Sequence, residues 1–130
     1  MIKFGYTIFY VKDVTKSIEF YEQAFGFARK FITPESDYGE MLTGETTISF
    51  ASTDFANSNL EGGFIQSDLN NQPFGIEIGL LTDDVGAAVT NAVAAGAKLI
   101  SEPAQKPWGQ TVAYVRDING FLVEICTPMG

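Results

Sequence analysis

Two glutamates stand inside apolar, strand-like runs of this chain. Glu77 lies in residues 75–81, and Glu124 lies in residues 121–126. A carboxylate in such a run is costly unless it is paired, solvated in a cavity or bound to something. If the two lie close together, they repel, and one carboxyl carries a proton near neutral pH. Such a pair could act as a general acid and base, hold Mg²⁺ or Mn²⁺, or hydrogen-bond a ligand amine, and the residues leave these alternatives open.

The composition narrows the chemistry further. The 130 residues include no histidine, which excludes histidine-based triads, histidine general bases and histidine-containing metal sites. The single cysteine, Cys126, forms no internal disulfide and is interpreted as a small buried residue, so we expect a cytoplasmic protein. The net charge of −8 argues against nucleic acid and anionic membranes as partners, and it allows a cationic or neutral small molecule. No apolar run approaches the roughly 20 residues that span a bilayer.

The first half predicts one helix among strands. Alternation over residues 3–11 indicates a strand with Tyr6 on one face and Phe9 on the other. A helix follows, capped by Asp13 or Thr15 and ended by Gly26, because its apolar residues are spaced three and four apart. Further strands are predicted at 27–33, 38–42 and 46–51.

The segment 52–73 is rich in Asn, Ser, Asp and Gly, which indicates a linker or a loop with apolar anchors. Loops of this length often cover binding sites. Phe55 and Phe64 would then either close over a ligand or anchor the loop.

The pattern then starts again, with strands predicted at 75–81, 99–101, 110–115 and 121–126 and a helix running from the cap Asp84 to Gly96. The turn between the last two strands, residues 116–120, contains the hairpin signal Asn119-Gly120.

The second half repeats the first. Asp13-Val14 matches Asp84-Val85, and Tyr38-Gly39-Glu40 matches Trp108-Gly109-Gln110, each about 70 positions apart. The chain therefore divides into a first βαβββ module (1–52), a connecting loop (53–73) and a second βαβββ module (74–130). We predict an α+β fold in which each sheet buries one face under its own helix and the other faces form a half-open cavity.

The repeat assigns partners to both glutamates. Tyr6 corresponds to Glu77, and Ser49 corresponds to Glu124, so these four positions are predicted to face the cavity. The matching residues Tyr38, Glu40, Trp108 and Gln110 are predicted to bind ligand at its mouth. The alternative is that Trp108 packs on the preceding loop and Glu40 is solvated.

Three stretches carry a family resemblance: YTIFYVKDVTKSIEFYEQAFGF, IEIGLLTDDVGAAVTNAVAAGAK and WGQTVAYVRDINGFLVEICTP. Together they resemble the vicinal oxygen chelate superfamily, which includes glyoxalases, extradiol dioxygenases and bleomycin-resistance proteins. The resemblance implies paired βαβββ modules in an eight-stranded incomplete barrel, and a homodimer. In metal-dependent members the ligands, commonly two or three His and Glu, come from the four positions. By that resemblance Tyr6 and Glu77 stand where histidine is usual, Ser49 stands where Glu or Gln is frequent, and Glu124 matches the commonest ligand.

The resemblance leaves two main functions open. The first is small-molecule binding without a cofactor, similar to the bleomycin-resistance members, whose acidic proteins hold basic ligands. The second is a lyase, isomerase or dioxygenase in which Glu77 and Glu124 hold a divalent metal or act as an acid/base pair. A third reading is a regulatory or structural domain that keeps the fold without the chemistry.

Overall fold

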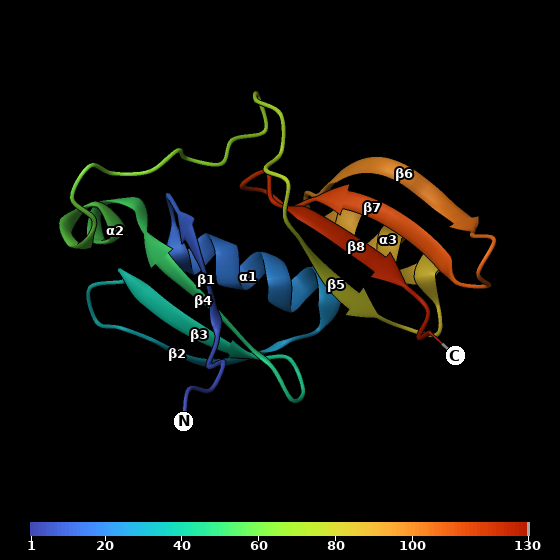
Figure 1. The fold of residues 1–130 in the computed structure, drawn as a ribbon, viewed down its shortest axis with the longest axis horizontal. Helices are drawn as coiled ribbons and strands as arrows, with labels where there is room; N and C mark the ends of the chain where they lie inside the picture. Colours follow the sequence, from blue (N-terminus) through green and yellow to red (C-terminus); the bar gives the residue numbers. More distant parts are fainter. Residues whose placement is uncertain (130) are drawn as a thin grey trace. The chain divides into compact units, whose positions relative to one another are not determined.

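The computed structural model describes residues 1–129, so Gly130, the last residue of the predicted second module, lies outside the described residues. The chain forms two compact units, each with its own four-stranded sheet (Figure 1). The first comprises Met1–Glu22 and Gly26–Gln66, and the second comprises Gln23–Phe25 and Ser67–Gly130. The chain passes from one to the other between Gln66 and Ser67, inside the predicted connecting segment.

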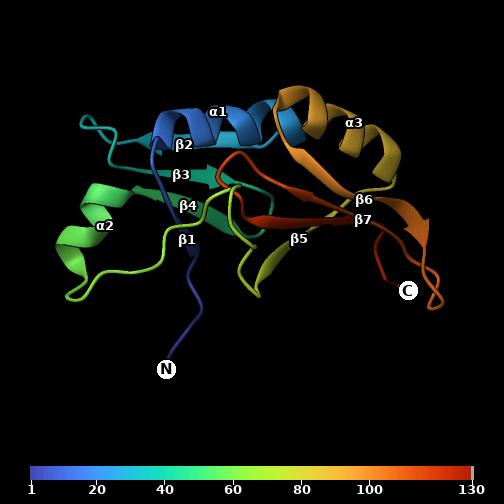
Figure 2. The same cartoon turned by 90° about the horizontal axis from the view of Figure 1, so that it is seen from above.

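The sheet of the first unit has the strand order β1-β4-β3-β2. Strand β1 is parallel to β4, and the other two pairings are antiparallel. Helix α1 lies along one face of this sheet (Figure 2), and the Tyr21 ring contacts the Phe50 ring at 5.4 Å between centroids. The elements of this unit are β1 (Thr7–Val11), α1 (Val14–Phe25), β2 (Ala28–Ile32), β3 (Tyr38–Leu42), β4 (Thr47–Ser52) and α2 (Thr53–Asn59).

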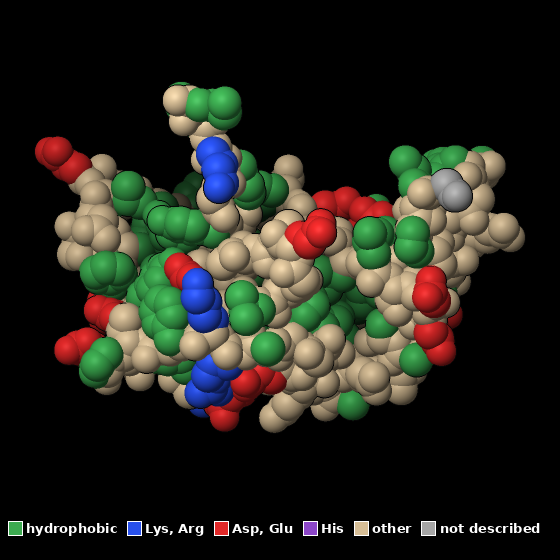
Figure 3. All heavy atoms as spheres, turned by 90° about the horizontal axis from the view of Figure 1, so that it is seen from below, with side chains coloured by type: hydrophobic (Ala, Val, Ile, Leu, Met, Phe, Trp, Pro, Cys, Tyr) green, Lys and Arg blue, Asp and Glu red, His purple; other side chains and the backbone are tan. Residues whose placement is uncertain are grey.

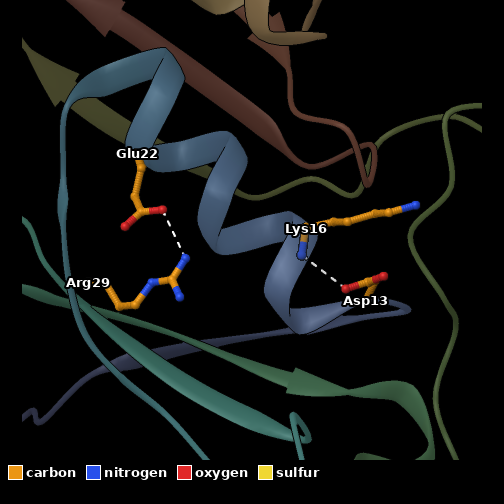
Figure 4. Close-up of polar contacts among 4 residues, drawn as sticks. All are labelled: Asp13, Lys16, Glu22 and Arg29. Atoms are coloured by element: carbon orange, nitrogen blue, oxygen red, sulfur yellow. Dashed lines mark hydrogen bonds and ion pairs between the residues drawn. The ribbon is translucent and has the colours of Figure 1, made fainter.

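Local interactions explain where α1 begins and ends. The Asp13 side chain accepts a hydrogen bond of 2.9 Å from the backbone N–H of Lys16 (Figure 4), which satisfies one of the free donors of the first turn. Gly26 ends the helix in the left-handed region at φ 73°. Just beyond it, Arg29 forms an ion pair with Glu22 at 3.0 Å. The predicted cap and stop signals are confirmed.

The second unit repeats this arrangement with the strand order β5-β8-β7-β6. Helix α3 contacts β6, β7 and β8 (Figure 2). Asp84 caps α3 through the backbone N–H of Ala87, and Gly96 ends it at φ 119°, as predicted. The elements are β5 (Glu77–Leu81), α3 (Val85–Ala95), β6 (Lys98–Gln105), β7 (Thr111–Arg116) and β8 (Leu122–Cys126). The eight strands and three helices within residues 1–129 confirm the predicted α+β class.

Two segments differ from their predictions. The segment expected to be a loop begins with a short helix, α2, because the Ser52 hydroxyl accepts from the backbone N–H of Phe55 and Ala56 is buried. The Phe64 ring lies 4.7 Å from the Tyr10 ring, which favours the anchoring role for this residue. Strand β6 is much longer than the predicted strand 99–101. Its pairing with β7 continues beyond two register shifts, as far as Gln105.

The turn between β7 and β8 contains a buried cation. Asp117 accepts hydrogen bonds from the backbone N–H groups of Asn119 and Phe121, as expected for turn chemistry. Arg116 reaches farther: its guanidinium donates to the carbonyl oxygens of Gly120, Asn71 and Asp68 at 2.9, 2.9 and 3.0 Å. Arg116 therefore fastens the segment that leads into β5.

No helix within residues 1–129 is long and apolar enough to cross a membrane. On the face that Figure 3 shows, Asp and Glu side chains are interspersed with exposed apolar side chains.

Candidate functional site

Both glutamates project from the face of the second sheet opposite α3. Glu124 is aligned with Gly79 on β5 and with Tyr114 on β7. Glu77 stands two residues before Gly79, so its side chain is on the same face as that of Glu124. Val123 and Ile125, which alternate with Glu124, are buried. The structure thus brings the two predicted carboxyl groups together on one surface.

The two carboxyl groups interact directly. Burial raises the pKa of Glu77, and the hydrogen bond and negative charge of Glu124 raise it further. A raised pKa favours the protonated form of Glu77, which can share its proton with Glu124 instead of repelling it. The surface therefore offers a hydrogen-bond donor and an acceptor side by side, which suits either proton transfer or the binding of a cationic nitrogen.

Tyr114 belongs to the same surface, although no motif in the sequence marks it. Burial raises the pKa of its phenol, and the charges of Glu77 and Glu124 add to the rise. The same causes keep Cys126 in its thiol form, since burial and then Glu124 raise the pKa of this cysteine. Counting residues outward from the β7–β8 turn would have found Tyr114, once the turn had fixed the register.

An open hollow adjoins the pair. It has a volume of about 290 Å³ and is lined by Gly75, Ile76, Glu77 and Leu122. Ile76 is 65% exposed and Leu81, farther along β5, is 67% exposed, so the carboxyl groups are flanked by uncovered apolar surface. Such a mixture of apolar walls and a few polar groups is typical of small-molecule sites.

The other predicted binding residues of the first half gather on the first sheet. Tyr38 donates a hydrogen bond of 2.7 Å to Glu40, and Lys30 lies 3.6 Å from the same carboxylate. Glu40 is therefore paired rather than simply solvated. Burial raises the pKa of Tyr38 to about 12; the Ser49 hydroxyl opposes this rise and Glu40 adds to it. Tyr6, the remaining residue of this group, is 51% exposed.

Ser49 is aligned with Glu40, and its side chain is fully buried. Its hydroxyl lies near Tyr38, yet within the described residues it makes no hydrogen bond of good geometry. Tyr6 and Ser49 belong to one unit, and Glu77 and Glu124 belong to the other. That the four share one cavity stays a prediction.

Trp108 and Gln110 repeat the geometry of Tyr38 and Glu40. The indole N–H donates a hydrogen bond of 2.7 Å to the Gln110 side-chain oxygen, and the Gln110 amide donates to the carbonyl of Thr127. Trp108 remains 63% exposed. Its ring is thus held in one orientation while most of its surface stays open to a ligand.

The donor set does not fit a metal centre of the kind found in metal-dependent vicinal oxygen chelate enzymes. Among residues 1–129, no three His, Cys, Asp or Glu side chains gather around a point that could hold an ion. Two carboxyl groups that share a hydrogen bond, beside a cysteine kept as a thiol, offer fewer ligands than such an ion requires.

Comparison with known proteins places the chain in a family. Residues 3–125 match the family model of the Glyoxalase/Bleomycin resistance protein/Dioxygenase superfamily. The chain belongs to this superfamily. The match extends over both units. It confirms the resemblance to the vicinal oxygen chelate superfamily that was drawn from the sequence.

Individual relatives of this superfamily member are distant. A probable lactoylglutathione lyase of Vibrio cholerae is 27% identical, over 92% of this chain and 86% of that protein. The lactoylglutathione lyase GLX1 of Arabidopsis thaliana is 29% identical over 95% of this chain, which spans only 43% of that protein. A glyoxalase-related enzyme from Fulvimarina pelagi shares the fold, with a TM-score of 0.82, 19% identity, and coverage of 98% of this chain and 89% of that one.

Proposed function

We propose that this protein binds a small organic molecule that carries a cationic nitrogen, which the Glu77–Glu124 pair receives. The observation that carries the proposal is that Glu77 and Glu124 project from the same uncovered face of the second sheet, where Glu77 lines an open hollow. A cationic nitrogen between the two carboxyl groups would take the place of the shared proton and form charge-assisted hydrogen bonds to both groups. The net charge of −8 favours the approach of a cationic ligand.

Trp108 of the same unit would contribute aromatic surface. Its indole is oriented by a hydrogen bond to Gln110, so its ring is preorganised for stacking. This arrangement is similar to what the bleomycin-resistance branch of the superfamily implies, namely a pocket that binds its ligand without a metal. A homodimer is part of the same proposal.

Thermal unfolding with three probes tests this function. Proflavine is a flat aromatic cation, amantadine is a globular cation and acridone is an uncharged analogue of the first. Proflavine should raise the melting temperature of the wild-type protein, and acridone should not. E124Q should lose the shift, whereas the matched control E102Q, which removes an exposed carboxylate from β6, should keep it.

Two results would overturn the binding proposal. One is the absence of a shift with either cation in the wild-type protein. The other is a stoichiometric divalent metal, found by elemental mass spectrometry in protein purified without chelators and lost in E124Q.

A second function has a specific observation in its favour. The raised pKa of Glu77 favours its protonated form beside Glu124, so the first could donate a proton to a substrate while the second accepts one. Curated relatives bear the name lactoylglutathione lyase, which makes this the first activity to assay. Turnover that disappears in both E77Q and E124Q would favour the enzyme, and its absence with or without added Mg²⁺ or Mn²⁺ would leave binding as the function.

A further inference from the structure

Gly79 stands in the middle of β5, where a glycine weakens a strand. Strand glycines usually have a structural reason: a positive φ, a bulge or a close neighbour. Gly79 is not among the glycines with positive φ, and β5 pairs with β8 without a register shift. A Cβ added to Gly79 would meet no atom within 4 Å. None of the usual reasons therefore applies within the described residues.

Gly39, in contrast, is a strand glycine whose close neighbours explain the absence of a side chain. It also lies within a strand, β3, but a Cβ there would come within 2.5 Å of Ile18 Cδ1 and 3.0 Å of the Phe31 carbonyl oxygen. The Phe31 backbone and the Ile18 side chain of helix α1 therefore leave little room for a side chain at Gly39. Within the part of the chain that the structure describes, no neighbouring atom limits the side chain at Gly79 in this way.

The repeat supplies a second contrast. Ile8 is aligned with Ser49 in the first sheet, as Gly79 is aligned with Glu124 in the second. Where the first sheet has a branched apolar side chain, the second has none. The space beside Glu124 is therefore left open by the choice of residue rather than by the course of the backbone.

We infer that Gly79 forms the floor of the ligand site, over which a flat organic cation lies with its charged nitrogen at Glu77 and Glu124. This inference rests on the proposed function and adds the shape of the ligand to it. Glu77 is aligned with Leu122, and both line the hollow. Two residues farther along the strands, Gly79 is aligned with Glu124 on the same face of the sheet. A flat ring system can cover both rows, and the exposed Leu81 offers it an apolar edge.

The substitutions G79A and G79V test this floor. Because the backbone of Gly79 is ordinary and its surroundings are open, both variants should fold with melting temperatures at or above that of the wild-type protein. Proflavine binding, followed by its fluorescence, should weaken in G79A and fall about tenfold or more in G79V. The matched control G86A makes the same change on α3 and should bind proflavine like the wild-type protein. Amantadine, which is globular, should bind the wild-type protein more weakly than proflavine does.

The possible results distinguish a failure of the inference about Gly79 from a failure of the proposed function. If neither cation binds the wild-type protein, the proposed function itself fails. If proflavine binds through Glu124 and G79V binds it equally well, the function survives and the floor is refuted. If G79V leaves proflavine binding unchanged but alters the oligomeric state in sedimentation experiments, the space over Gly79 receives a second copy of the chain, and the inference is wrong.

Discussion

Arg116 allows a demanding test of how the second unit is held together. Its side chain is only 4% exposed and donates three hydrogen bonds to backbone carbonyls, two of them on the segment that enters β5. A hydrogen bond from a charged donor contributes about 1.5–3 kcal/mol, and such contributions are not additive within one cluster. The hydrogen bonds to Asp68 and Asn71 are partly buried, so water can replace the lost donor there, whereas the hydrogen bond to Gly120 is buried. We therefore expect R116A to cost about 2–4 kcal/mol of unfolding free energy.

Urea unfolding measures this cost directly, with the fluorescence of Trp108 as a reporter inside the same unit. R116K should recover part of the loss, because an ammonium keeps the charge but cannot reach three carbonyls in the geometry of a guanidinium. The matched control is R29A, because the Arg29 side chain is 39% exposed and its pair with Glu22 lies on the surface. That substitution should cost no more than about 1 kcal/mol. A loss below about 1 kcal/mol in R116A, or one equal to that of R29A, would refute the reasoning.

Three further predictions concern neighbouring features. The folded state raises the pKa of Glu77, so protonation of Glu77 stabilises the protein fully below the ordinary glutamate pKa. This stabilisation is lost as pH rises through the raised pKa. E77Q should therefore raise the melting temperature more at pH ~8 than at pH ~5. G120A should cost about 2 kcal/mol or more in urea unfolding, since φ is 92° and the new methyl would meet Arg116 at 2.8 Å and the Asp68 backbone at 2.9 Å. Q110A should lower the fluorescence anisotropy of Trp108 by removing its hydrogen-bond acceptor, while the emission stays that of an exposed indole.

The parts of the fold that the sequence predicts well are those with local signals. Asp13 and Gly26 bound α1 because a cap and a stop act within a few residues of the helix they delimit. Alternation along one strand is likewise local, and it places Glu77 and Glu124 on the open face of their sheet. The role of Arg116 has no local signal, because two of its acceptors lie 45 and 48 residues earlier in the chain. Tyr114 is an intermediate case, since its place beside Glu124 can be predicted only after the β7–β8 turn has fixed the register between the two strands.

The two sheets have matching strand orders but carry different side chains at corresponding positions. The row of Ile8, Ser49 and Glu40 in the first sheet corresponds to the row of Gly79, Glu124 and Tyr114 in the second. In the first row Ser49 is fully buried, and the carboxylate of Glu40 is already paired with Lys30 and Tyr38.

In the second row the glycine leaves space, and Glu124 interacts with another carboxyl group instead of a cation. Because both rows occupy the same positions of the same fold, folding alone does not account for the difference. An uncovered glycine weakens the strand, and two adjacent carboxyl groups make the ionisation of both unfavourable. A ligand that brings a flat surface and a positive charge offsets both effects. This is why we place the binding chemistry of the protein on the second sheet.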